Sequence, residues 1–132
     1  MLEKVTLLDQ FCAENRCQYL DGDFFSMITA KVDCQIIRGV LHGFNDDQTG
    51  AILKNCHSAL AANGKLLIVE RIVESDNQPS MNKMMDILMM ALLTGRERTI
   101  EIWDKLLFES GFKINSTFKK PSDFTIIEAT KA

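Results

Sequence analysis

Apolar residues recur every three or four positions in four stretches of the chain, and this spacing predicts four helices. Leu2, Val5, Leu8 and Cys12 carry the first, and Met81, Met84, Met85, Leu88, Met89 and Leu92 carry the third. Asn45 and Gln48 form a capping-box pattern at the start of the second, which Asn63-Gly64 is suited to end. Thr99 caps the fourth, which ends at Gly111.

Five shorter apolar runs predict strands. They are Cys17–Leu20, Val32–Ile37, Lys65–Val69, Phe112–Phe118 and Phe124–Ala129. The run Val32–Ile37 is mostly apolar, which is typical of a strand buried on both faces. The short connection Lys119–Ser122 favours an antiparallel pair at the end of the chain. Strands that alternate with helices therefore predict an α/β fold, with a mostly parallel sheet and an antiparallel pair at its C-terminal end.

Composition limits the classes of binding partner and the cell compartment to be expected. The chain has 132 residues, enough for one domain, and its net charge of −3 favours neither nucleic acid nor an anionic membrane. The longest apolar run, Ile87–Leu93, is far shorter than the ~20 residues of a membrane span. No secretory signal opens the chain, and no cysteine pair has the C-x-x-C spacing, so we expect free buried thiols in a cytoplasmic protein.

Candidate chemistry lies where three predicted strands end, because ligands bind at the C-terminal ends of strands in such sheets. The three segments are Gly22–Phe25, Arg38–Phe44 and Glu70-Arg71. Asp23 beside Phe24 suits a nucleoside, since a carboxylate accepts hydrogen bonds and an aromatic ring stacks on a base. A Gly-Asp pair is equally a common turn.

The other candidates also have structural alternatives. His42 is either a core histidine or a functional one. Glu70 directly follows an apolar strand, where a charged side chain is expected to have an ion-pair or hydrogen-bond partner or a functional role. Arg96-Glu97-Arg98 is typical of a solvated charge cluster, and the methionine stripe suits plain core more than a substrate pocket.

Five blocks in order resemble one family, the S-adenosylmethionine-dependent small-molecule O-methyltransferases, which include caffeate, acetylserotonin and polyketide O-methyltransferases. The blocks are Gly22–Phe25, Val40–Asp47, Asn63–Arg71, Gly95–Thr99 and Ser110–Phe112. The resemblance implies a class I, Rossmann-like methyltransferase sheet. It also implies S-adenosylmethionine as cofactor and the hydroxyl of a small aromatic molecule as methyl acceptor, with no metal.

The resemblance assigns roles to eight positions of this chain. His42 matches the general base, and Glu70 and Glu97 match the two acids that flank it. The cofactor positions, on the adenine side, are Asp23, Phe24, Arg38 and Phe44. Met89 lies in the segment that contacts an aromatic substrate. Histidine suits the base because its unperturbed pKa of about 6.5 leaves it largely neutral at physiological pH.

The chain departs from the family pattern in two ways. Gly43 replaces the aspartate that usually follows the base. The family's N-terminal dimerisation region and glycine-rich cofactor loop are not found in residues 1–132, and Asp9, a possible ribose acid, is placed in a helix instead. We therefore expect a truncated catalytic domain that lacks the first two strands.

This truncation predicts an open sheet edge. The family's sheet order is 3-2-1-4-5-7-6, so without strands one and two the strand Val32–Ile37 becomes an apolar edge. Three outcomes follow: the family's strand three, Cys17–Leu20 here, closes onto it, two copies pair as a homodimer, or a separate N-terminal half completes the sheet. The alternative function is an inactive fragment or interaction module that keeps part of the fold. A nicotinamide dehydrogenase half is disfavoured, since G-x-G-x-x-G is absent.

Overall fold

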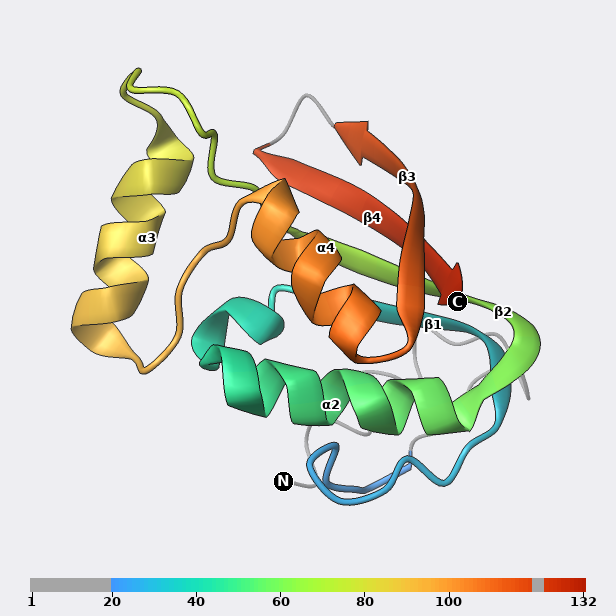
Figure 1. Ribbon diagram of the computed structural model, residues 1–132. Coiled ribbons are helices and arrows are strands. Elements are labelled where there is room, and N and C mark those ends of the chain that lie inside the picture. The colour runs from blue at the N-terminus through green and yellow to red at the C-terminus, as the bar shows by residue number, and fades with distance from the viewer. Residues whose placement is uncertain (1–19, 120–122) are drawn as a thin grey trace, which may run out of the picture.

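The computed structural model describes residues 20–119 and 123–132, which form a mixed four-stranded sheet with helices on one side (Figure 1). The strands are β1 (Val32–Arg38), β2 (Leu60–Arg71), β3 (Phe112–Lys119) and β4 (Phe124–Lys131), in the spatial order β1-β2-β4-β3. β1 pairs parallel to β2, and the other two pairings are antiparallel. This order is the 4-5-7-6 part of the expected sheet, so the predicted α/β fold class is confirmed. The predicted helix at residues 2–12 and residues 17–19 of the predicted first strand lie outside the described part.

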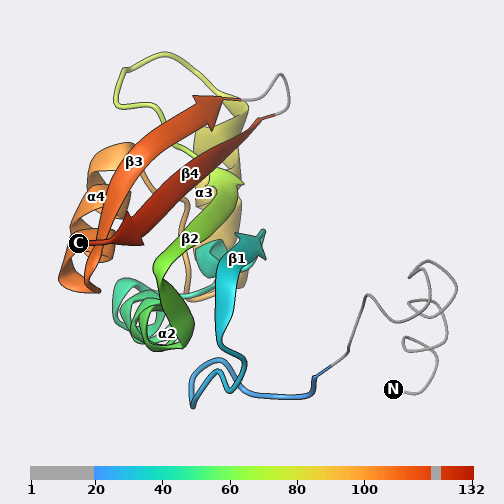
Figure 2. The same cartoon turned by 90° about the vertical axis from the view of Figure 1, so that its right-hand side faces the viewer.

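Two helices cover one face of this sheet. α2 (Asp46–Ala59) and α4 (Ile100–Glu109) lie side by side on that face (Figures 1 and 2). Strand β2 alternates accordingly: Leu66, Ile68 and Glu70 are fully buried, while the residues between them are partly exposed. Buried apolar side chains of the helices and strands complete the core, among them Ile52, Leu53, Trp103, Leu107, Phe112, Ile127 and Ala129.

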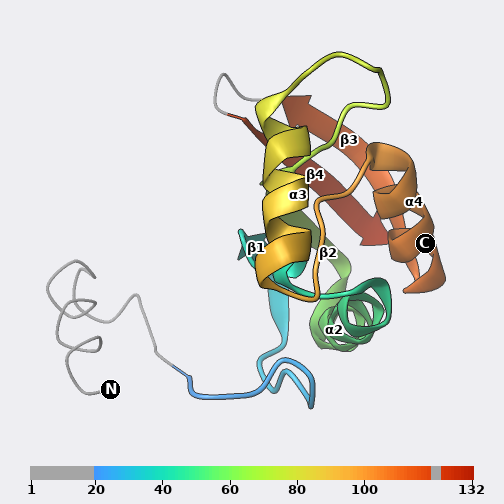
Figure 3. The same ribbon diagram turned by 90° about the vertical axis from the view of Figure 1, so that its left-hand side faces the viewer.

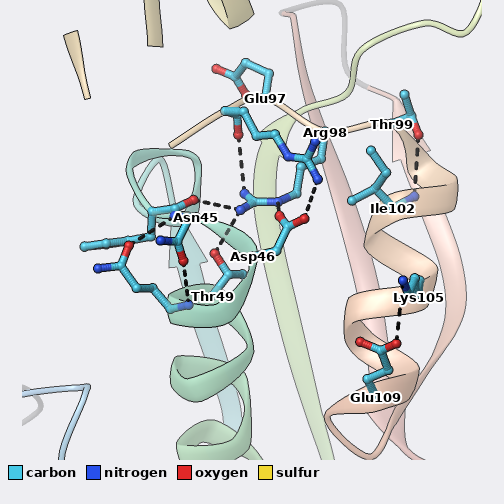
Figure 4. Close-up of polar contacts among 12 residues, drawn as sticks. Asn45, Asp46, Thr49, Glu97, Arg98, Thr99, Ile102, Lys105 and Glu109 are labelled. Atoms are coloured by element: carbon cyan, nitrogen blue, oxygen red, sulfur yellow. Dashed lines mark hydrogen bonds and ion pairs between the residues drawn. The ribbon is translucent and has the colours of Figure 1, made fainter. Parts of the chain in front are cut away.

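The helix ends follow the predicted capping residues in three cases. Asn45 and Gln48 exchange side-chain and backbone hydrogen bonds in a full capping box at α2. Thr99 accepts a hydrogen bond from the Ile102 backbone at α4 (Figure 4), and Gly111 follows that helix with a φ of 86°. Only a residue without a side chain adopts such a backbone angle readily.

The predicted end of α2 at Asn63-Gly64 is wrong. The helix stops at Ala59, and Leu60 already has extended backbone angles and pairs with Val32. Leu60 is 3% exposed, so burial of its side chain in the core favours the early turn into β2. Gly64 serves close packing instead of a left-handed turn, because a Cβ there would lie 2.7 Å from the Leu60 side chain and 2.9 Å from the Asp33 carbonyl oxygen.

The prediction that both faces of β1 are buried is wrong, and β1 is also an edge strand. Ile36 is 66% exposed, and no strand of the described residues pairs with the outer side of β1. The expected open edge is therefore present in this part of the chain. Cys34, on the same strand, is an exposed free thiol, whereas Cys56 is buried, and burial raises its pKa to about 11. The expectation of buried thiols thus holds for only one of these two cysteines; Cys12 and Cys17 lie outside the described residues.

The methionine stripe forms a helix as predicted, α3 (Met81–Leu92), but it is not core. Met81, Met84 and Leu92 are each more than half exposed, and Asn82 is the buried residue of the helix. Figure 1 shows α3 to the left of the sheet, apart from α2 and α4, and Figure 3 shows it from that side. The apolar side chains of α3 stay exposed because no described helix or strand packs on them. Among the described residues, no helix is both long and apolar enough to cross a membrane.

Candidate functional site

The candidate site forms around a short turn that follows β1. Gly39, with a φ of 63°, turns the chain out of the strand, and residues Leu41–Gly43 form a single 3-10 turn, η1. Because β1 runs parallel to β2, this turn and the end of β2 lie at the same edge of the sheet. His42 on the turn and Glu70 on β2 therefore meet, although 28 residues separate them in sequence.

Glu70 holds the turn through both of its carboxylate oxygens. Its Oε1 accepts hydrogen bonds from the backbone N–H groups of Val40 (3.0 Å) and Leu41 (2.8 Å). Its Oε2 lies 2.8 Å from His42 Nδ1. The Glu70 side chain is fully buried, whereas the His42 side chain is 25% exposed. A buried carboxylate thus fixes one ring nitrogen and leaves part of the imidazole accessible, the arrangement of a His–acid pair.

Glu97, the second predicted acid, lies beside this pair. It precedes α4 and is 4% exposed. One of its carboxylate oxygens, a ring nitrogen of His42 and a carboxylate oxygen of Glu70 all lie within 4.8 Å of one another. Its Oε2 is buried without a hydrogen-bond partner among the described atoms. Burial raises the pKa of Glu97; the charge of Glu70 acts in the same direction and that of His42 opposes it. The structure therefore brings the three predicted catalytic side chains together at one point.

The interpretation of Arg96-Glu97-Arg98 as a solvated charge cluster is wrong for two of its three residues. Arg98 is 1% exposed, and its guanidinium also lies 5.2 Å from the centre of the Trp103 ring. Burial lowers the pKa of Arg98, opposed by its bond to Asp46. Charge composition alone does not distinguish such a buried arginine from a solvated one, and the sequence offered no signal for its place near His42.

The predicted adenine side of the site is more open. Asp23 accepts hydrogen bonds from Phe25 N (2.9 Å) and Ser26 Oγ (3.1 Å), so its carboxylate shapes a local turn. The rings of Phe24, Phe25 and Phe44 pack together, with centroids 5.1 to 5.8 Å apart. Phe24 and Phe25 are each 40% exposed. The predicted turn is thus present, and beside it the three rings form an aromatic wall.

The remaining predicted residues are more dispersed. Arg38 places its guanidinium 5.2 Å from the ring centre of Phe124. With Phe24 it also lines an apolar groove of about 480 Å³ that runs along β1. Met89 is half-buried on α3. Gly43 has room for a side chain, because a Cβ there meets only Leu93, at 3.7 Å.

Comparison with known proteins gives one consistent answer. Residues 4–113 match the family model described as the O-methyltransferase domain. The chain is 36% identical over 115 residues to the phenazine O-methyltransferase PhzM of Lysobacter antibioticus, covering 87% of this chain and 34% of that protein. It is 31% identical to the probable inactive O-methyltransferase 11 of Dictyostelium discoideum, covering 85% and 34% respectively.

A solved structure supports the same match. The crystal structure of LaPhzM superposes with a TM-score of 0.90 at 34% identity, covering 96% of this chain and 38% of that one. The chain thus spans about a third of the length of the curated relatives it matches.

Proposed function

Because the chain belongs to the O-methyltransferase domain family, we propose that it supplies the general base of a methyl transfer to a hydroxyl group. The acceptor is a small aromatic molecule and the donor is S-adenosylmethionine. The observation that carries this proposal is the convergence of His42, Glu70 and Glu97 from three separate segments. A partly exposed imidazole held by a buried carboxylate is suited to accept a proton from a bound hydroxyl.

His42 acts as the base through the ring nitrogen that Glu70 does not hold. Glu70 keeps the ring in one orientation and stabilises the imidazolium that forms when the proton arrives. The buried, unpaired carboxylate oxygen of Glu97 offers a second hydrogen-bond acceptor. It would act near the His42 ring or near the hydroxyl group that receives the methyl. S-Adenosylmethionine, when bound, supplies an electrophilic methyl group. General-base help of this kind contributes about 10²–10⁴-fold to a rate.

The cofactor's adenine end is assigned to the aromatic wall. Members of this family bind S-adenosylmethionine or S-adenosylhomocysteine. Phe24 and Phe44 present ring faces and edges for stacking, and Asp23 offers a carboxylate at an exposed turn. Arg38, over Phe124, lines the same groove as Phe24 and is assigned to the cofactor side with it. Met89 is assigned to the acceptor side, on the exposed helix α3.

A second function is supported by two observations. The chain spans about a third of its relatives, and one of them is named a probable inactive O-methyltransferase. An inactive fragment or interaction module that keeps this part of the fold is therefore the alternative. For either function the partner surface is the open edge of β1, completed by a second copy or by a separate N-terminal half.

The deciding experiment is a calorimetric titration of the purified chain with S-adenosylhomocysteine, carried to millimolar ligand. Micromolar binding that Asp23→Ala abolishes supports the cofactor site; Asp21→Ala, a carboxylate two residues away on the same exposed loop, is the matched control and should bind normally. A panel of phenolic acceptors then tests the base, with a 10²–10⁴-fold loss of rate expected in His42→Ala. Heat no larger than the dilution blank would refute cofactor binding by this chain and favour the inactive alternative.

A further inference from the structure

We propose that Arg98 is a positioning residue that locks the His42 turn onto Glu70 from the opposite side. The proposal concerns residues 40–44, called the His42 turn below. Its meaning for catalysis rests on the proposed function, in which His42 is the base. The geometry of the lock stands without it.

Glu70 satisfies only the donors of the His42 turn. Its carboxylate accepts the N–H groups of Val40 and Leu41 and contacts the His42 ring. Within the turn, the backbone N–H groups of Gly43 and Phe44 donate to the Val40 and Leu41 carbonyl oxygens at 3.1 and 3.3 Å. A positive charge on the carbonyl side adds stronger, charge-assisted hydrogen bonds to these neutral ones.

Arg98 provides this charge (Figure 4). Its Nη1 donates to the Leu41 carbonyl oxygen at 3.0 Å, and its Nη2 donates to the Phe44 carbonyl oxygen at 2.7 Å. These two carbonyls bracket His42 in the chain. Nη2 also donates to Thr49 Oγ1 at 3.0 Å, which ties the turn to the first turns of α2. The His42 turn is thus held between a buried anion on its N–H side and a buried cation on its C=O side.

The fork of Arg98 is fully used. Its two remaining N–H groups donate to Asp46 Oδ1 (2.9 Å) and to the Arg96 carbonyl oxygen (3.3 Å). All five N–H donors of the guanidinium therefore have partners. A lysine has three donors at a single point and cannot span two carbonyls in this way.

Pairing with Asp46 does not by itself explain Arg98. Arg96 also contacts the Asp46 carboxylate, through the other oxygen, yet its side chain is 44% exposed and donates to neither carbonyl of the turn. The Arg98 side chain is fully buried. Burying a guanidinium is costly, and the two turn carbonyls are what its buried position reaches that the Arg96 position does not.

Gly95 gives independent support. The chain passes so close to the His42 turn at this residue that a Cβ would lie 2.6 Å from Phe44 N and 2.5 Å from the Gly43 carbonyl carbon, and would overlap the His42 carbonyl oxygen. Real Cβ atoms do not approach backbone so closely. The segment that carries Arg98 and Glu97 is therefore pressed against the His42 turn, three residues before Arg98.

The test is amide hydrogen exchange measured by NMR on the full chain, comparing Arg98→Lys with the matched control Arg96→Lys. Loss of the charged fork is expected to speed exchange of the Val40 and Leu41 amides about tenfold, while the Ile52 and Leu53 amides in α2 stay within about twofold of the wild type. The control should leave both sets unchanged. Equal acceleration of both sets in Arg98→Lys indicates general destabilisation and would overturn the proposal, as would unchanged exchange at Val40 and Leu41.

A second variant keeps the question open to disproof if Arg98→Lys does not fold. Thr49→Val preserves side-chain shape but removes one Arg98 acceptor and the Thr49 hydroxyl that donates to the Leu41 carbonyl oxygen at 3.5 Å. About threefold faster exchange confined to the His42 turn is expected, and no local change refutes the lock. S-Adenosylhomocysteine is titrated into the same wild-type sample. Absence of binding there counts against the proposed function and leaves the exchange comparison valid.

Discussion

The two turns that form the candidate site are held in very different ways. The His42 turn is bound by Glu70, by Arg98 and by the backbone of Gly95, all buried and all distant in sequence. The turn at residues 23–26 is shaped by its own Asp23 side chain and tied elsewhere by a bond from Asn55 Nδ2 to the Phe24 carbonyl oxygen. The proposed base is thus preorganised within this chain, whereas the proposed adenine wall, the rings of Phe24, Phe25 and Phe44, depends on local and exposed contacts. Variants in the first turn should affect folding, and variants in the second should affect binding.

The largest effect is expected from Glu70→Ala. Removing this fully buried carboxylate leaves two backbone N–H groups and the His42 ring without their partner, while Arg98 keeps its bond to Asp46. We expect a loss of about 3–5 kcal/mol in the free energy of unfolding. Urea unfolding followed by the fluorescence of Trp103, the single tryptophan and a core residue, measures it. A loss below 1 kcal/mol would show that the His42 turn does not depend on Glu70.

The next effect separates two glycines of the same corner. Gly95→Ala forces a Cβ into the backbone of the His42 turn, whereas Gly43→Ala meets only the Leu93 side chain at 3.7 Å. We expect a loss of about 1–3 kcal/mol for Gly95→Ala and less than about 0.5 kcal/mol for Gly43→Ala. Thermal melts of both variants check this difference. Equal Tm values would contradict the close approach of the two segments.

A pH-dependent effect is expected at Glu97. Burial and the charge of Glu70 raise its folded-state pKa above the ordinary value of 4.5, while His42 and Arg71 oppose them and Asp86 adds to them. As pH rises from 4.5 through the raised folded pKa, the folded state holds a proton that the unfolded state has lost. This term therefore stabilises the fold below 4.5 and is lost as pH rises.

Glu97→Gln removes that titration. The variant should gain stability relative to the wild type as pH rises from 4.5 to 7.5, measured by urea unfolding at both values. Groups that do not act on the pKa of Glu97, such as Asp46, titrate in both proteins and cancel in the difference. A stability difference that is the same at both pH values, or that changes in the opposite direction, would show that folding does not raise the pKa of Glu97.

The smallest effect on stability is expected from Asp23→Ala. Its two hydrogen bonds lie within one exposed turn, so the free energy of unfolding should fall by less than about 1 kcal/mol. Binding of S-adenosylhomocysteine, in contrast, should be lost. A large loss of stability would erase the distinction between the two turns.

Local signals in the sequence predicted most of the fold. Asn45, Gln48, Thr99 and Gly111 cap or end helices as expected because caps act over a few residues. The end of α2 was mispredicted because burial of Leu60 in the core outweighs the turn preference of Asn63-Gly64. The exposure of α3 and Ile36 was also missed, since apolar periodicity reports what a residue prefers and not which neighbours are present to cover it.

The site was predictable only in part, and for a related reason. His42, Glu70 and Glu97 were proposed from a family resemblance, and the fold brings them together. The buried state of Arg98 was not foreseen, because it depends on carbonyl groups of residues more than 50 positions away. No pattern within the Arg96–Arg98 run encodes that distance.

The place of β4 in the sheet also affects how the chain folds as it is made. This strand, residues Phe124–Lys131, lies between β2 and β3 and pairs with each of them, so β3 joins the sheet only through β4. A ribosome releases β2 more than fifty residues before β4. During that interval the backbone of the apolar residues Leu66 and Ile68 lacks the β4 partners with which it pairs in the sheet. Nascent chains stalled before residue 124 should therefore bind chaperones and resist release, and completion of β4 should end that binding in one step.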